Sequence, residues 1–551
     1  MNFFYSLISK KQTSVRSAAI ILMIMVALSR VLGLVRDRIL ASHFSPEELG
    51  IYFAAFRIPN LLFELLVMGA LTSAFIPVFT KYIAEDKEKA AWKMASVLIN
   101  VCTIILAILC IPLVIWTKEI STLIAPGFDP NQIELMASFT RVMMVSQVFP
   151  LLIGNFFTGI LQSYQYFFFP AFAPVLYNLC IIAGTIIFVP FVGLWAPVIG
   201  IGIGAFAFMA IQIPSLMKVG YRPVFSIDIH EPGVKEVFSL MIPRTMGLAV
   251  SQIDTTVDLI LASVLGARMV TIFNFAQHLQ QVPIGLFGAT IAQAVFPLLA
   301  QASARNDESE YKKGVISAFN QTIFYVLPIS ILFIVLRIPI IRLVFGTAKF
   351  DWNATVLTGI TLSMFSISLI AQAASQVLTR AFYAKYNTKT PVIISVITIL
   401  INTAISIICI QYYHLPVWAL GVSTSIASFI NAGALLMCLC QKKYGFTLKE
   451  FVGAPAKMLI AAAVMGAALY IPLKLFDQLI FDTTRTFGLI FLTGVSGTIG
   501  FFWYAFLVWV FGVSEARSFF KMIDKVRRPK SFFIEPANEV IGNGTQNSPM
   551  A

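Results

Sequence analysis

Six charged side chains interrupt the first two strongly apolar segments of the chain. Arg30, Arg36, Asp37 and Arg38 lie in the first segment, and Arg57 and Glu64 lie in the second. An ionised group inside a membrane is energetically costly, so it is normally functional or paired. Guanidinium groups stay charged and donate in a planar fork that suits phosphate. These residues therefore predict a cationic cavity for an anionic substrate. The alternative is that Arg36 and Arg38 reach the outer surface and that Arg57 pairs with Glu64.

Two further carboxylates lie four residues apart in a later apolar segment. Asp254 and Asp258 share one helix face, where two carboxylates repel unless one is protonated or a cation lies between them. We expect them to hold a coupling ion, H⁺ or Na⁺, with Asn402 and Thr424 as candidates to add neutral oxygens from later helices. The alternative is local pairing or a solvated cavity wall.

Residue types in these segments predict binding and ion coupling rather than catalysis. His278 lies in the following apolar segment, where it either titrates or simply forms a hydrogen bond. No nucleophile–base constellation, phosphate-binding glycine loop or zinc motif is present, so we expect a protein that is not an enzyme and has no cofactor beyond the coupling ion. The candidate substrate-binding residues are Arg30, Arg36, Asp37, Arg57, Glu64 and His278, and the candidate ion-coupling residues are Asp254, Asp258 and Asn402.

The elements that position these residues are predicted to be membrane-spanning helices. Hydrophobic residues make up 58% of the 551 residues and charged residues only 12%, whereas soluble domains have about 45–50% and about 25%. The net charge of +13 comes mostly from loops, so nucleic acid is not an expected partner. Fourteen segments are long and apolar enough to span a bilayer: 17–40, 49–79, 94–117, 136–161, 167–190, 193–217, 237–265, 270–299, 315–336, 353–379, 391–411, 415–440, 455–474 and 486–512.

Lysine and arginine are concentrated in alternate loops, which indicates the orientation of the chain. Placing the N-terminus inside the cell assigns most cations to inner loops, and the even number of helices then makes both termini cytoplasmic. The outer loops contain only Lys118, Arg268, Arg337, Arg342, Lys349, Lys474 and Arg485.

An internal repeat divides the predicted all-α membrane protein. Residues 37–42 read D-R-I-L-A-S and residues 258–263 read D-L-I-L-A-S, and the same offset of 221 aligns Arg57 with His278. Two parallel six-helix halves followed by two more helices are therefore expected. The predicted domains are 1–225, 226–445, a two-helix unit at 446–530 and a disordered cytoplasmic tail at 531–551.

Several stretches resemble the MurJ/MviN family of lipid II flippases. They are S-R-V-L-G-L-V-R-D-R-I-L-A (29–41), F-A-A-F-R-I-P-N-L-L (53–62), G-A-L-T-S-A-F-I-P-V-F (69–79), G-I-L-Q-S (159–163), P-A-F-A-P-V-L-Y-N (170–178) and V-S-Q-I-D (250–254). The resemblance implies fourteen helices in a MATE-like fold, in which the last two form a groove for a polyprenyl tail.

The same resemblance implies a function in peptidoglycan biosynthesis. The expected substrate is undecaprenyl-pyrophosphate-linked disaccharide-pentapeptide, moved from the inner to the outer leaflet of the bacterial cytoplasmic membrane by alternating access. Arg30, Arg36 and Asp37 match cavity positions of the family, and Asp258 matches a sodium-ligand position. Membrane lipids are further expected partners, and we expect a monomer that works with the cell-wall synthesis machinery.

The sequence departs from the family pattern at several cavity positions. Many members have Asp at Gly50, Arg-Arg at Phe63-Glu64, Glu at Met68 and Asp-Arg at Gln277-His278. Three alternatives therefore stay open. One is a flippase for another polyprenyl-linked glycan, and another is a scaffold that binds glycan lipids without transporting them. The third is a MATE-like cation-coupled exporter, against which the arginines and the two extra helices argue.

Overall fold

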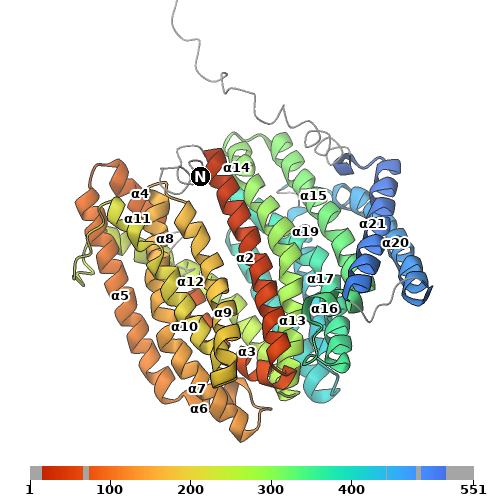
Figure 1. Ribbon diagram of the computed structural model, residues 1–551. Helices are drawn as coiled ribbons and strands as arrows, with labels where there is room; N and C mark the ends of the chain where they lie inside the picture. Colours follow the sequence, from red (N-terminus) through yellow and green to blue (C-terminus); the bar gives the residue numbers. More distant parts are fainter. Residues whose placement is uncertain (1–14, 66–73, 442–443, 480–485, 517–551) are drawn as a thin grey trace, which may run out of the picture.

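A computed structural model describes residues 15–65, 74–441, 444–479 and 486–516, which form helices and contain no strand (Figure 1). Eleven helical runs in these residues are long and apolar enough to cross a membrane. The three remaining predicted spans coincide with α2 (Val15–His43), with α3 (Pro46–Phe63) and α4 (Ile76–Ala84), and with α12 (Pro232–Val264), which contain most of the charged site residues. The predicted all-α membrane fold is confirmed, and the described residues of all fourteen predicted segments are largely helical.

The first half of the protein, defined here as α2–α11, continues after α4 with seven further helices. Pro130 begins α7, where a capping box between Asp129 and Gln132 satisfies the first backbone amides. Gly184 and Gly200 let α9 and α10 approach so closely that a Cβ on Gly184 would lie 2.7 Å from the Cα atom of Gly200. The helices are α5 (Glu88–Ile115), α6 (Thr117–Ile124), α7 (Pro130–Ser146), α8 (Val148–Ser163), α9 (Phe168–Val192), α10 (Trp195–Ala210) and α11 (Ile213–Lys218).

The second half, defined as α12–α19, contains two π-helical segments that the sequence did not predict. One interrupts the predicted helix 270–299 and the other ends the predicted helix 391–411. Its elements after α12 are α13 (Ala267–Pro283), η3 (Ile284–Ala289), α14 (Thr290–Ala304), α15 (Glu308–Val335), α16 (Arg337–Phe345), α17 (Trp352–Ala384), α18 (Lys389–Ile407), η4 (Ile408–Tyr412) and α19 (Trp418–Leu439).

The last two helices, α20 (Leu448–Leu479) and α21 (Thr486–Val510), form a pair at the edge of the second half (Figure 1). The buried Tyr504 on α21 donates a hydrogen bond to the carbonyl oxygen of Phe324 on α15 at 3.0 Å. A second buried core joins this pair to α14, α15, α17 and α19. The predicted tail at 531–551 lies outside the described residues.

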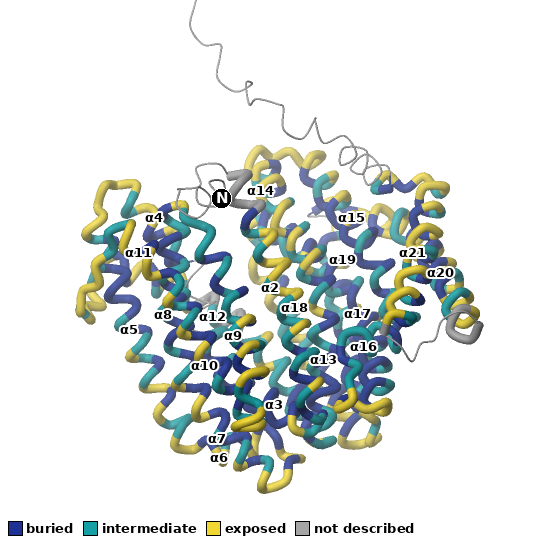
Figure 2. The backbone as a smooth tube through the Cα atoms, in the orientation of Figure 1, coloured by how far each residue is buried: buried dark blue, intermediate teal, exposed yellow. Residues whose placement is uncertain are grey.

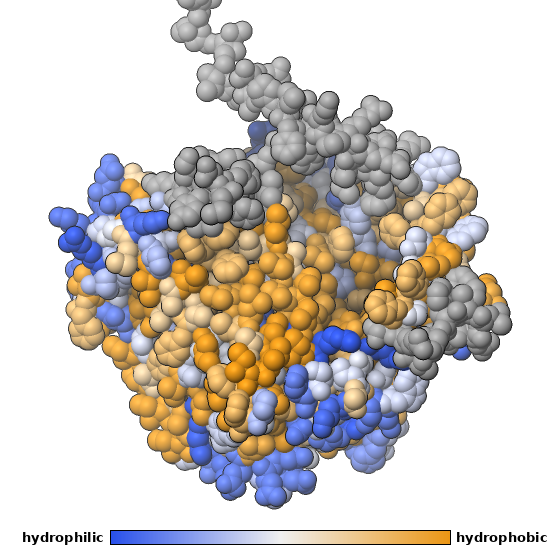
Figure 3. Space-filling model, viewed as in Figure 1, coloured by the Kyte–Doolittle hydropathy of each residue, from blue (hydrophilic) through white to orange (hydrophobic). Residues whose placement is uncertain are grey.

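The surface agrees with a protein surrounded by lipid. Exposed residues follow the outward faces of many helices (Figure 2), and a broad apolar band covers the middle of the molecule (Figure 3). Water would not favour such a large apolar surface, whereas hydrocarbon would. The short helices α6, α11 and α16 lie at the ends of spanning helices, where the sequence predicted loops or helix ends.

Candidate functional site

A polar cavity of about 410 Å³ lies between the two halves and is lined by residues of α2, α3, α12 and α13. Five of the six predicted substrate-binding residues line it, namely Arg30, Arg36, Arg57, Glu64 and His278. The sixth, Asp37, is buried directly behind Arg36. Residues that are more than 240 positions apart in the sequence therefore share one cavity.

Asp37 connects the two halves through an arginine and a histidine. The Nε and Nη2 atoms of Arg36 donate to Oδ1 of Asp37 at 3.0 and 2.8 Å. The Nδ1 atom of His278 on α13 lies 2.8 Å from the other carboxylate oxygen, Oδ2. Asn178 on α9 accepts a bond from Nη1 of Arg36 at 3.3 Å. This network fixes the Arg36 guanidinium at the cavity wall, where 20% of its side chain remains exposed.

Arg57 is held by backbone and side-chain oxygens of α12. Its Nε and Nη2 atoms donate to Oγ1 of Thr256 at 3.0 and 2.8 Å, and Nη2 also donates to the side-chain oxygen of Gln252 at 3.0 Å. All of these acceptors are neutral, so the charge of Arg57 is not cancelled by the groups that orient it. The arrangement differs from the sequence alternative of an ion pair with Glu64.

Arg30 and Arg38 illustrate how one helix presents cations to two regions. Arg30 is exposed and lines the cavity. Arg38 instead donates to the carbonyl oxygens of Leu343 and Val344 on α16, at the end of α2 that lies far from the N-terminus. Three of the arginines on α2 and α3 therefore face the cavity, and one joins α2 to the second half.

The predicted ion-coupling residues meet at a buried contact between α12 and α18. The side-chain amide of Asn402 donates to Oδ1 of Asp254 at 3.0 Å, and Asp258 lies against Asn402 and Ser406. Among the described residues, Oδ1 of Asp258 and Oδ1 of Asn402 are buried oxygens without a hydrogen-bond partner. Buried oxygens without a partner are costly, so these atoms suit a small cation, or a proton on Asp258.

The cavity is closed at the end of the bundle that lies opposite to the N-terminus of α2. Gly50 of α3 packs directly on the backbone of Ala267 at the start of α13. The hydroxyl of Thr271 donates to the carbonyl oxygen of Pro46 at 2.6 Å. Phe275 on α13 stacks on Phe345 of α16 with ring centroids 4.0 Å apart. The contacts of Gly50 and Thr271 join the two halves at this end, and the ring stack packs α13 against α16 within the second half.

Arg268 adds an ionic link to the same closure. Its guanidinium donates to Glu47 of the first half at 3.0 Å and to both carboxylate oxygens of Asp351 of the second half at 2.5 and 2.6 Å. The hydrogen bond from Arg268 holds the pKa of Asp351 below its usual value. A single cation thus joins carboxylates of both halves.

Sequence reasoning missed several residues that orient the predicted ones. Asn178 ends the stretch P-A-F-A-P-V-L-Y-N, which offered a signal, and Ser406 lies one helical turn after Asn402. Ser406 and Ser423 are fully buried and their hydroxyl oxygens lie 2.6 Å apart. Thr424, considered as a further ligand, instead donates to the carbonyl oxygen of Leu420 in its own helix.

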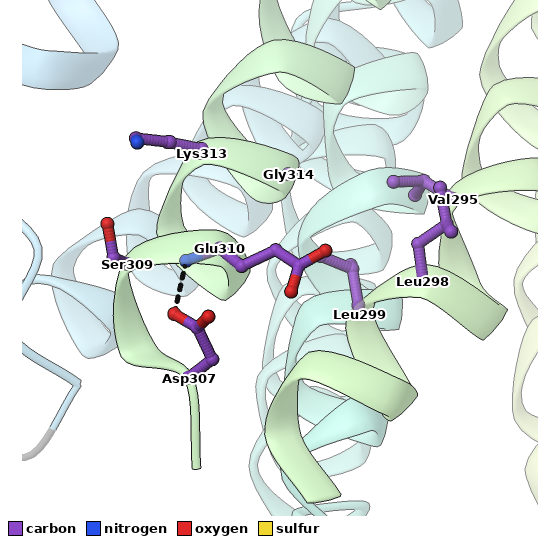
Figure 4. A pocket seen from close by; sticks show the side chains of 8 residues that line it. All are labelled: Val295, Leu298, Leu299, Asp307, Ser309, Glu310, Lys313 and Gly314. Carbon is purple, nitrogen blue, oxygen red and sulfur yellow. Dashed lines mark hydrogen bonds between the residues drawn. The ribbon is translucent and has the colours of Figure 1, made fainter. Parts of the chain in front are cut away.

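A separate surface pocket between α14 and α15 includes the residue that caps α15 (Figure 4). The Asp307 carboxylate accepts a hydrogen bond from the backbone amide of Glu310 at 2.8 Å, which stabilises the first turn of α15. The pocket shares no lining residue with the central cavity.

Comparison with known proteins identifies the family. The family model described as lipid II flippase MurJ matches residues 15–487. The chain belongs to the MurJ family. The lipid II flippase MurJ of Burkholderia cenocepacia is 28% identical over 456 residues, which cover 80% of this chain and 86% of that protein. A probable lipid II flippase MurJ of Buchnera aphidicola is 27% identical over 510 residues, covering 90% and 98%.

Solved structures agree with membership of the MurJ family. A lipid II flippase MurJ in an inward closed conformation superposes with a TM-score of 0.74 and 26% identity, covering 89% of this chain and 98% of that chain. An inward-facing MATE family transporter superposes with a TM-score of 0.63, at 14% identity and with coverage of 78% and 99%. The MATE likeness concerns the fold. The protein is thus a multi-pass membrane protein of a bacterial flippase family.

Proposed function

We propose that this protein flips lipid II from the inner to the outer leaflet of the bacterial cytoplasmic membrane by alternating access. The observation that carries the proposal is the convergence of Arg30, Arg36 and Arg57 on one cavity between the two halves. A pyrophosphate is a doubly charged group that suits guanidinium donors. The family membership and the MurJ names of its relatives support lipid II as the substrate.

Each cavity residue has a distinct part in this proposal. Arg36, oriented by Asp37, and Arg57, oriented by α12, donate to the pyrophosphate, and Arg30 adds charge at the exposed side of the cavity. Glu64 and His278 contact the head group beside the phosphates. The substrate leaves chemically unchanged, and the protein works as a monomer alongside the cell-wall synthesis machinery, with both termini in the cytoplasm.

Alternating access then requires the closed end to open. The contacts at Gly50, Thr271 and Arg268 all join the first half to the second half, so separation of α3 from α13 breaks them together. Na⁺ or H⁺ held by Asp254, Asp258 and Asn402 between α12 and α18 would neutralise the two carboxylates, because buried carboxylates repel one another when ionised. Asp258 and Asn402 hold this ion through the two oxygens that otherwise lack partners.

The test measures transfer of lipid II in proteoliposomes by wild-type protein and by the variants Arg30→Ala and Arg36→Ala. Charge-assisted hydrogen bonds contribute about 1.5–3 kcal/mol, so each loss should slow transfer about tenfold to a hundredfold. Arg141→Ala is the matched control, because Arg141 is exposed, lies in the same half and is absent from the cavity lining.

Equal transfer by wild type and both cavity variants would refute pyrophosphate recognition by these arginines. If folded wild-type protein does not transfer lipid II but transfers a polyprenyl pyrophosphate carrying another glycan, the substrate assignment is wrong while the cavity assignment stands.

A further inference from the structure

The linker between the two halves lies against the side of α5. It is defined here as residues 219–231, which follow α11 and precede α12, on the same side of the molecule as the N-terminus of α2 (Figure 1). Residues 221–228 are non-helical, although α5 is apolar enough to cross a membrane. Non-helical backbone inside a bilayer needs protein partners for its polar groups. The partners of the linker backbone therefore bear on where this segment lies.

Two polar side chains of α5 hold the linker. The side-chain amide of Asn100 donates to the carbonyl oxygens of Val224 and Ser226 at 3.2 and 3.0 Å. The hydroxyl of Ser96 accepts a hydrogen bond from the backbone amide of Val224 at 3.1 Å, and it lies 3.1 Å from the hydroxyl oxygen of Tyr221. Asn100 and Ser96 thus compensate backbone groups that would be costly to remove from water without a partner.

The contacts follow α5 toward the middle of its apolar stretch. The ammonium group of Lys93 forms an ion pair with Glu231 at 2.7 Å, near the end of the linker. Asn100 lies seven residues further along the same helix, which corresponds to about 10 Å at the helical rise per residue. The linker therefore reaches well beyond the level of this charged pair.

The far end of α5 gives a second measure of depth. Trp116 caps this end and is 55% exposed, as aromatic rings commonly are at a membrane boundary. Along the helix, Asn100 lies about 24 Å from Trp116 and Lys93 lies about 35 Å from it. Since the hydrocarbon layer is about 30 Å thick, Asn100 falls inside this layer and Lys93 falls outside it.

The exposed side chains of the linker are suited to this depth. Phe225 is 90% exposed, and Val224, Ile227 and Ile229 are exposed apolar neighbours. Water disfavours such a cluster, whereas hydrocarbon accommodates it. Phe225 lies between the two residues whose carbonyl oxygens are bound by Asn100, so its ring lies near the level of Asn100.

We propose that residues 224–227 of the linker insert into the membrane leaflet at the N-terminal end of α5, with the Phe225 ring in hydrocarbon. In the orientation proposed above, this is the inner leaflet. The partner is the acyl region of the bilayer, and Asn100 allows the linker backbone to lie there by satisfying its carbonyl groups. The inserted residues do not line the central cavity, so this lipid contact goes beyond the proposed flipping function.

Accessibility of single spin labels tests this insertion in the full-length protein, reconstituted in vesicles of phosphatidylethanolamine and phosphatidylglycerol. The labels replace one residue at a time, by Phe225→Cys, Ile108→Cys or Lys89→Cys, in a background without the six native cysteines. Ile108 is exposed in the middle of α5 and reports hydrocarbon, whereas the exposed Lys89 at its start reports water. A water-soluble nickel complex should lose access to the label at position 225, as it does at position 108, while dissolved oxygen retains access.

Nickel accessibility at position 225 that is closer to that at position 89 than to that at position 108 would overturn the proposal, because the linker would then lie in water. If Phe225→Cys does not fold, Ile227→Cys provides the same comparison, since Ile227 is 57% exposed. The measurement does not depend on lipid II transfer. Its failure therefore leaves the proposed function intact, and a failure of transfer leaves the depth of the linker unchanged.

Discussion

Gly50 offers the sharpest test of how the cavity is closed. A Cβ at position 50 would lie 1.8 Å from the carbonyl oxygen of Ala267, whereas ordinary contact begins at 3.4 Å, so the backbones of α3 and α13 must separate by about 1.6 Å. The neighbouring atom is backbone and cannot rotate away. Over-packing of this kind costs about 1–3 kcal/mol, which would lower the ratio of closed to open protein about fivefold to 150-fold in Gly50→Ala.

Distance measurements between spin labels would report this change directly. Labels at Lys118→Cys on α6 and Asn353→Cys on α17 occupy exposed positions in different halves, in a background without the six native cysteines. Gly50→Ala should populate longer distances than the parent protein. Gly33→Ala is the matched control, because a Cβ on Gly33 of α2 meets nothing within 4 Å.

Two results would refute this reasoning. Unchanged distances together with unchanged thermal stability would mean that α3 and α13 are not in close contact in the resting protein. A lower melting temperature without longer distances would mean that the substitution destabilises the whole fold rather than the closed arrangement.

Two further predictions concern buried carboxylates. Asp37→Asn should lower the free energy of unfolding by about 3 kcal/mol, because it leaves the Arg36 guanidinium without its counter-charge. His278→Gln retains the pair of Arg36 with Asp37 and should cost less. Equal losses of the two variants in denaturant titrations would contradict this ordering. If Na⁺ is the coupling ion, it stabilises the folded protein, so wild type should melt at a higher temperature in sodium chloride than in choline chloride. Asp258→Asn should abolish this difference in melting temperature. A difference that persists in the variant would exclude Asp258 as a ligand.

The spanning helices could be predicted because hydrocarbon imposes length and apolarity on each of them. Helices occupy the described parts of the predicted segments, and the charged residues within α2, α3 and α12 led us to predict functional sites there. The π-helical turn at 284–289 was missed, because its apolar residues fit a regular helix equally well. The helix α16 was missed for a different reason: its nine residues contain two arginines and are too short to register as a span.

The membership of the cavity could also be predicted, but not its internal pairing. Arg57 was predicted to be a cavity residue from its position in an apolar segment, and it lines the cavity, yet its partners Gln252 and Thr256 lie 195 and 199 residues away. Similarly, the contact of Asp37 with His278 spans 241 residues. Spacing along one helix indicates which side chains share a face, whereas the partner on another helix depends on packing that a single sequence does not encode locally.

The two copies of one repeat position hold a buried carboxylate in different surroundings. Asp37 and Asp258 are equivalent in the repeat, and both are almost fully buried, at 1% and 4% exposure. Asp37 is neutralised by Arg36 and faces His278, so it fixes cationic groups at the cavity wall. Asp258 has an amide and a hydroxyl beside it in place of a cation, and one of its oxygens lacks a partner. A buried charge must be compensated, so we expect the copy with an internal cation to support substrate binding and the copy without one to take up an ion.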